Sequence, residues 1–144
     1  GLILDLRGNP GGNLNTVCDI AREILPKGLI VYTEDKNGKR TEYTCDGTNQ
    51  IKEPLVVLVD SGSASASEIL AGAIKDYGIG TLVGTTTFGK GSNYYTPNGN
   101  NIHKIGIAPD IEEKFDGEAY YNDGVDNQLN KAIEVMNGKL GDGQ

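Results

Sequence analysis

The sequence predicts a single α/β domain with a mixed, mostly parallel sheet flanked by helices. Short apolar runs rich in β-branched residues alternate with segments in which apolar residues recur at helical spacing. A strand–helix–strand order occurs twice, which favours parallel strands joined by crossover helices. A length of 144 residues suits one domain with a substantial core, and 21 glycines provide for many tight turns.

The first strand–helix unit fills the N-terminal part of the chain. Residues 2–6 form a mostly apolar strand, and the loop 7–12 ends in two glycines whose unusual dihedrals expose backbone amides. Asn13 or Asn15 is expected to cap a helix over 14–25. The glycine loop therefore lies between a strand end and a helix start.

A hairpin and a polar connector come next. Residues 29–34 and 40–45 alternate as strands around an Asn-Gly pair, which is a common hairpin turn. Residues 48–53 are polar and are expected to cross without regular structure.

The second strand–helix unit is the one around which the chain is organised. The apolar run 55–59 is a buried strand that ends in the turn cluster 60–63, helix 66–77 follows, and 81–84 is a short strand. The strand thus delivers several serines to a helix N-terminus, where free N–H groups and the helix dipole favour negative charge. This arrangement suits an ordinary helix cap or a site that stabilises an oxyanion.

The rest of the chain is less regular. A glycine-bracketed loop spans 85–92, and 105–111 is expected to be extended because of its proline. Asp126 is expected to cap a last helix over 127–137, and the glycine-rich tail 140–144 to fray.

Charge and hydropathy exclude several classes of partner. A net charge of −7 argues against nucleic acid and against an anionic membrane surface. No apolar run reaches transmembrane length, and no signal peptide is recognisable. Because the chain opens directly on a strand, we interpret it as part of a longer protein, and its compartment does not follow from these residues.

Cysteine and histidine are scarce. Cys18 and Cys45 lie far apart in the sequence with no CxxC spacing, so a disulfide between them is possible but not indicated. A buried thiol is the preferred interpretation for Cys18. His103 is the one histidine, which argues against a histidine-based metal cluster.

A serine hydroxyl needs a base to become a nucleophile, and the chain offers two candidates. His103 lies in a polar turn with no recognisable carboxylate partner, so a surface position is preferred. Lys90 stands between two glycines that let it turn inward, although catalysis requires desolvation and a solvated loop lysine is the simpler interpretation. A helix and a strand that run back past each other separate Ser65 from Lys90, so proximity is expected. Local pattern does not choose among Ser63, Ser65 and Ser67.

Four separated motifs occur in an informative order. They are GLILDLRGNPGG (1–12), PLVVLVDSGSASASEI (54–69), GTTTFGKG (84–91), and YYTPNG (94–99) with GIAPD (106–110). Together they resemble the C-terminal processing peptidases (tail-specific proteases, serine peptidase family S41) over roughly residues 1–113.

The resemblance implies a ClpP/crotonase-like core and cleavage of proteins near unstructured, apolar C-termini by a Ser–Lys dyad without metal or cofactor. It assigns Ser65 as the nucleophile and Lys90 as the base, with the backbone N–H groups of Gly12 and Ala66 as the oxyanion hole. Ser63 and Ser67 become turn and capping residues. Expected partners are protein or peptide substrates and no nucleic acid, with a homo-oligomer left open, in an extracytoplasmic (periplasmic or cell-envelope) bacterial setting.

The sequence also departs from the family pattern. Family members continue after Gly-Lys-Gly with a Val-Gln pair, whose glutamine positions the lysine, and with a hairpin. Here Tyr94 occupies the position four after Lys90, so that hairpin is expected to be missing after Ser92. The family's PDZ domain is likewise expected to lie outside these 144 residues.

These observations divide the chain into a truncated peptidase core, 1–113, and a C-terminal extension, 114–144, with its helix at about 127–137. The function that they favour is a serine endopeptidase. The alternative is a catalytically inactive S41-like fragment or pseudoenzyme that acts as an interaction or assembly module.

Overall fold

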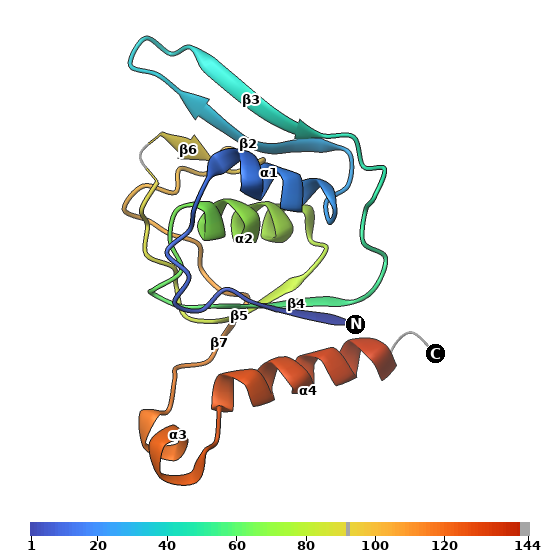
Figure 1. The fold of residues 1–144 in the computed structure, drawn as a ribbon, viewed down its shortest axis with the longest axis vertical. Helices are drawn as coiled ribbons and strands as arrows, with labels where there is room; N and C mark the ends of the chain where they lie inside the picture. Colours follow the sequence, from blue (N-terminus) through green and yellow to red (C-terminus); the bar gives the residue numbers. More distant parts are fainter. Residues whose placement is uncertain (92, 142–144) are drawn as a thin grey trace.

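The computed structural model describes residues 1–91 and 93–141. The elements, in chain order, are β1 (Leu2–Asp5), α1 (Leu14–Arg22), β2 (Gly28–Glu34), β3 (Arg40–Cys45), β4 (Leu55–Val59), α2 (Ala66–Tyr77), β5 (Thr81–Gly84), β6 (Tyr94–Tyr95), β7 (Ile111–Glu112), α3 (Gly117–Asp123) and α4 (Asn127–Gly141). They stack in layers, with α1 and α2 between two sheets and α4 outside the lower sheet (Figure 1).

The parallel sheet carries the predicted strand–helix units. Its strand order is β1-β4-β5-β7 and all its pairings are parallel. All five residues of β4 are buried, as expected of a central strand that is covered on both faces. The carboxyl ends of β1 and β4 therefore meet at one edge, where both glycine- and serine-rich loops begin.

The hairpin forms a sheet of its own and does not join the parallel one. Its order is β3-β2-β6, all antiparallel. Tyr32 of β2 pairs with Tyr95 of β6, and their rings stack with centroids 4.9 Å apart. The single mixed sheet that was expected is therefore two separate sheets. The reason is that β2 pairs with β6, more than sixty positions later in the chain, and not with a strand of the parallel sheet.

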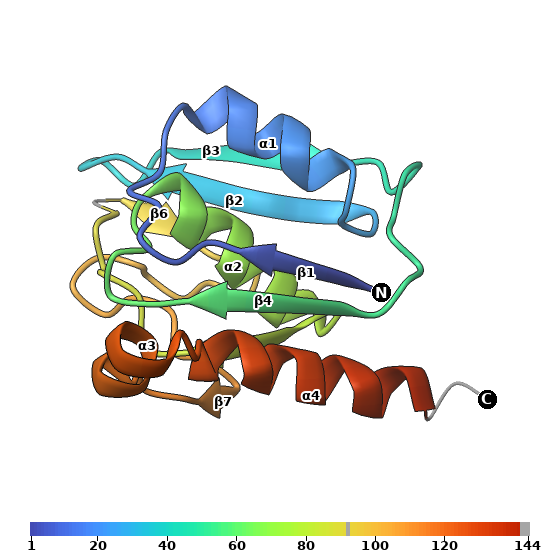
Figure 2. The ribbon, with the colours of Figure 1, turned by 60° about the horizontal axis from the view of Figure 1, so that its bottom comes forward.

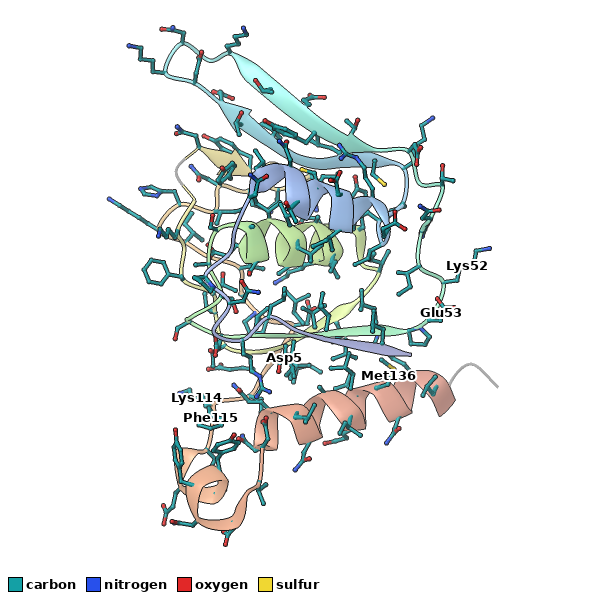
Figure 3. All side chains as sticks on the ribbon, viewed as in Figure 1. Asp5, Lys52, Glu53, Lys114, Phe115 and Met136 are labelled. Atoms are coloured by element: carbon teal, nitrogen blue, oxygen red, sulfur yellow. The ribbon has the colours of Figure 1, made fainter. Side chains whose placement is uncertain are left out.

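Alternation along β4 divides the hydrophobic core into two clusters. Leu55, Val57 and Val59 pack toward α1 and α2, while Val56 and Leu58 face α4. In Figure 2, α4 runs along the sheet beside β1 and β4, and in Figure 3 the side chain of Met136 points from α4 toward that sheet. The C-terminal helix therefore completes the core by covering the second face of the parallel sheet.

Several expected boundaries change. The first helix ends at Arg22 with Glu23 as its C-cap, and the segment expected to be extended from 105 begins with Ile105 as the last residue of a turn over 103–105. The sequence analysis missed α3, which Asp116 caps by accepting a hydrogen bond from the amide of Ala119 at 3.0 Å. The last helix includes Leu140 and Gly141 of the expected tail, and 142–144 lie outside the described residues.

None of the helices in the described part of the chain combines the length and the apolar character needed to cross a membrane.

Candidate active site

Ser65 occupies a strained turn between β4 and α2. Its backbone has φ +54° and ψ −115°, a conformation that L-residues rarely adopt and that costs on the order of 1–3 kcal/mol. It is the N-cap of α2 and is half-buried. The turn therefore places the Ser65 hydroxyl at the N-terminal, electropositive end of a helix.

The hydroxyls of the neighbouring serines are already engaged. Ser63 Oγ donates to the carbonyl of Leu6 at 2.8 Å, and Ser67 Oγ donates to the carbonyl of Asn9 at 3.1 Å. Within the described residues, Ser65 Oγ donates no hydrogen bond and so stays available for chemistry. The two flanking serines fasten the glycine loop after β1 to the turn around Ser65.

The glycine loop packs tightly on this turn. The carbonyl of Asn9 also accepts the Ala64 amide at 3.0 Å. Gly11 has φ +92°, and a Cβ added there would lie 2.6 Å from the Ala64 oxygen and 2.7 Å from the Ala66 nitrogen. Glycine is therefore required at this position, both for its dihedral and for the closeness of the two loops.

The predicted oxyanion donors line one cavity. Gly12 and Ala66 both border a cavity of about 230 Å³, whose lining includes Ala66 and Ser67 on the C-terminal side of Ser65 but not Ser65 itself. In the part of the chain that the structure describes, neither amide donates a hydrogen bond to another protein group. Two backbone N–H groups that border one cavity without a protein acceptor are the kind of donors that an oxyanion hole uses.

The same cavity is largely apolar and lies between α1 and the start of α2. Its lining residues are Leu6, Asn9, Gly11, Gly12, Asn13, Thr16, Val17, Ile20, Ala66, Ser67 and Leu70. An apolar cavity that is bordered by free backbone amides can hold one apolar side chain of a bound molecule.

The loop that contains Lys90 contacts the turn around Ser65 through backbone hydrogen bonds, and the Lys90 side chain takes no part in them. The amide of Phe88, in the same loop, donates to the carbonyl of Ser63 at 3.0 Å. The side chain of Lys90 is exposed, and among the described residues its Nζ makes neither an ion pair nor a hydrogen bond. The structure thus brings the Lys90 loop and the Ser65 turn together without a hydrogen bond between the two side chains.

Glu68 is the functional candidate that the sequence analysis missed. Its side chain is completely buried in the first turn of α2. Its carboxylate accepts hydrogen bonds from the amide of Ser65 at 2.9 Å and from the amide of Lys90 at 3.0 Å. The Ser-x-x-Glu spacing of a capping box is the signal that could have indicated this residue.

The remaining candidate residues show no arrangement that points to a chemical role. His103 is exposed in a turn, as expected, and its amide donates to Asn101 Oδ1. Cys18 and Cys45 are buried free thiols, and burial raises the pKa of Cys18. Ser92, after which the family hairpin is expected to be missing, lies outside the described residues.

Comparisons with known proteins agree on one family. The model of Peptidase family S41 matches residues 1–93. The carboxyl-terminal-processing protease of Synechocystis sp. is 42% identical over 158 residues, which take in 96% of this chain and 37% of that protein. Since those 158 positions exceed the 144 residues of the chain, the relative carries residues within this span that the chain lacks.

Solved structures support the same conclusion. The photosystem II D1 C-terminal processing protease has a TM-score of 0.74 and 41% identity, covering 79% of this chain and 34% of its own. The tricorn protease, at 24% identity and a TM-score of 0.69, covers 97% of this chain and 15% of its own and shares the fold alone. The expected fold class is therefore confirmed, the chain spans about a third of the length of the two processing proteases, and it belongs to peptidase family S41.

Proposed function

We propose that this chain carries the catalytic centre of a serine endopeptidase that cleaves proteins near their C-termini, with Ser65 as nucleophile and Lys90 as general base. The observation that carries the proposal is the position of Ser65. Its hydroxyl stands on a strained turn at a helix N-terminus, directly before Ala66. Among the described residues the amides of Ala66 and Gly12 donate to no protein group, and both residues border one cavity. An arrangement of this kind stabilises a developing oxyanion.

The reaction follows from these positions. Lys90, as the neutral amine, takes the proton of Ser65 Oγ while that oxygen attacks the scissile carbonyl carbon. The tetrahedral oxyanion accepts hydrogen bonds from Gly12 and Ala66. The C–N bond then breaks, the leaving amine receives the proton from Lys90, and water hydrolyses the acyl-enzyme by the same route.

Catalysis requires the Lys90 side chain to turn inward from its exposed position. The neutral form of an amine is favoured when the group is removed from water. The glycines at 89 and 91 flank Lys90, and its backbone is anchored to Glu68, so the movement that we propose is a rotation of the side chain. The exposed Nζ is also the observation that favours the rival function, an inactive S41-like interaction module.

The apolar cavity favours substrates with an apolar residue on the acyl side of the cleaved bond. Its wall is formed by Val17, Ile20 and Leu70, with Thr16 at its edge. Protein or peptide substrates with unstructured, apolar C-termini fit this cavity. From the resemblance of the sequence to the family, we further propose that the protein acts outside the cytoplasm.

Labelling with a serine-directed fluorophosphonate tests the proposal. We expect wild-type protein to be labelled, Ser65→Ala not at all, and Lys90→Ala about 10²–10⁴-fold more slowly, the usual contribution of a general base. Lys114→Ala is the matched control, because Lys114 is an exposed lysine beside α3 (Figure 3). Equal labelling of all four proteins would contradict the dyad, and a folded wild type that is never labelled would favour the inactive module.

A further inference from the structure

We infer that Glu68 is a positioning residue that locks the base-bearing loop to the nucleophile turn. This inference rests on the dyad proposed above and concerns the backbone that holds it. The loop meant is 87–90, which contains Lys90, and the turn is 63–66, which contains Ser65.

The carboxylate of Glu68 accepts four hydrogen bonds. Oε1 accepts from Thr87 Oγ1 at 2.6 Å and from the Gly89 amide at 2.5 Å. Oε2 accepts from the Ser65 amide at 2.9 Å and from the Lys90 amide at 3.0 Å. A single oxygen, Oε2, thus bridges the backbones of the proposed nucleophile and the proposed base.

An ordinary helix cap does not require this arrangement. In a capping box the glutamate accepts from the N-cap amide, which here is the bond from Ser65. The other three donors come from residues 19 to 22 positions further along the chain. Glu68 therefore binds a distant loop to the start of α2, and the positive end of that helix favours its buried charge.

A third segment, residues 104–107, also holds the loop that contains Lys90. Thr87 Oγ1 accepts the Ile107 amide at 2.7 Å while it donates to Glu68. The carbonyl of Gly89 accepts the Lys104 amide at 2.8 Å. The loop is therefore held on both sides, and Lys90 projects from a fixed backbone.

The chemistry of the four donors makes the carboxylate hard to replace. Three of them are backbone N–H groups, which cannot become acceptors, and the hydroxyl of Thr87 already accepts the Ile107 amide with one of its two lone pairs. In Glu68→Gln the amide NH2 would face the Gly89 N–H in one orientation and the N–H groups of Ser65 and Lys90 in the other, so at least one backbone donor would lose its acceptor. A buried donor left without an acceptor is costly, so this substitution should separate the loop from the turn.

Fluorophosphonate labelling measured against reagent concentration and pH tests the inference. For folded Glu68→Gln we expect a maximal labelling rate about 10–100-fold below wild type, since small misplacements of catalytic groups have effects of this size. The reagent concentration for half-maximal rate should stay unchanged. The alkaline rise in rate should move to higher pH, because the Lys90 backbone is no longer fixed beside the Ser65 turn and its amine is removed from water less effectively. If Glu68 only stabilised the fold, the Glu68→Gln substitution would not shift the pH dependence of the labelling rate.

Glu53→Gln is the matched control. Glu53 is exposed before β4, at the end of that strand away from Ser65 (Figure 3). We expect it to match wild type in rate and pH profile. If folded Glu68→Gln behaves like the wild type while labelling still depends on Ser65 and Lys90, the inference about Glu68 is overturned. Loss of that dependence in the wild type would instead overturn the proposed function.

Amide hydrogen exchange on the wild-type protein gives a second test that needs no variant. If one carboxylate holds all three, the amides of Ser65, Gly89 and Lys90 should be protected together and open with similar free energies. Free exchange of Gly89 and Lys90 beside a protected Ser65 would overturn the inference, whether or not Glu68→Gln folds.

Discussion

Arg7 and Asp126 form a two-pronged ion pair, with Nη1 and Nη2 of the arginine 2.9 Å from Oδ1 and Oδ2 of the aspartate. Asp126 also accepts the amide of Leu129 at 3.0 Å at the start of α4. Arg7 directly precedes the glycine loop that ends in Gly12. The C-terminal helix is thereby tied to the loop that supplies a proposed oxyanion donor.

This pair makes stability depend on pH. The Arg7 guanidinium holds the pKa of Asp126 below its usual range, chiefly through their hydrogen bonds. A carboxyl whose folded pKa is depressed stabilises the fold above its unfolded pKa of about 3.9, and that contribution is lost as the pH falls further. We expect Asp126→Asn to lower the free energy of unfolding by about 1–3 kcal/mol at pH 7 and by little near pH 2, in urea titrations.

Asp123→Asn is the control for this prediction. Asp123 is an exposed aspartate at the end of α3. It should unfold like the wild type at both pH values. A constant difference between Asp126→Asn and wild type across this range would show that the ion pair is not its source.

Gly11 and Gly12 form a matched pair for the oxyanion loop. Alanine at Gly11 places Cβ 2.8 Å from the Ser65 Cβ and within 2.7 Å of two backbone atoms, whereas a Cβ at Gly12 meets nothing within 4 Å. We expect Gly11→Ala to push the loop away and reduce labelling about 10²–10³-fold, the usual effect of losing one oxyanion donor. Gly12→Ala keeps its N–H, so its labelling rate should stay within a few-fold of wild type. Equal losses of labelling rate in Gly11→Ala and Gly12→Ala would mean that the oxyanion donor lies elsewhere.

Thr16 lies at the edge of the apolar cavity and is exposed. Thr16→Phe should obstruct the cavity and raise KM about 10-fold for peptides with a branched apolar residue before the cleaved bond. Labelling by a small fluorophosphonate should not change. Asn15→Phe, at the neighbouring exposed position outside the cavity lining, is the control. An unchanged KM in Thr16→Phe would mean that substrates bind elsewhere.

Met136 anchors α4 to the parallel sheet, with 6% of its surface exposed. Met136→Ala should cost about 2–5 kcal/mol of unfolding free energy, because it removes buried apolar surface and leaves a cavity. Leu140→Ala, on the same helix with 46% exposure, should cost much less. Thermal and urea unfolding of both variants distinguishes the two, and similar losses would contradict the packing of α4.

Local patterns predicted most of the regular structure. The strands 55–59 and 81–84 and the helix 66–77 match their expected bounds, because each carries its own apolar periodicity and its own turn residues. Asn13 caps α1 as expected, with its side chain accepting two amides. The hairpin sheet is different, because its third strand is chosen by contacts with residues far along the chain.

For the candidate site, the sequence by itself determined the residue types, namely a serine at a helix start, a lysine between glycines and a loop with exposed amides. Only the tertiary structure decided how they are joined. Ser63 and Ser67 bond to a loop more than fifty positions earlier, and the buried Glu68 bonds to the loop of Lys90. Such bonds form between segments that are brought together by strand pairing and helix packing, so no local periodicity encodes them.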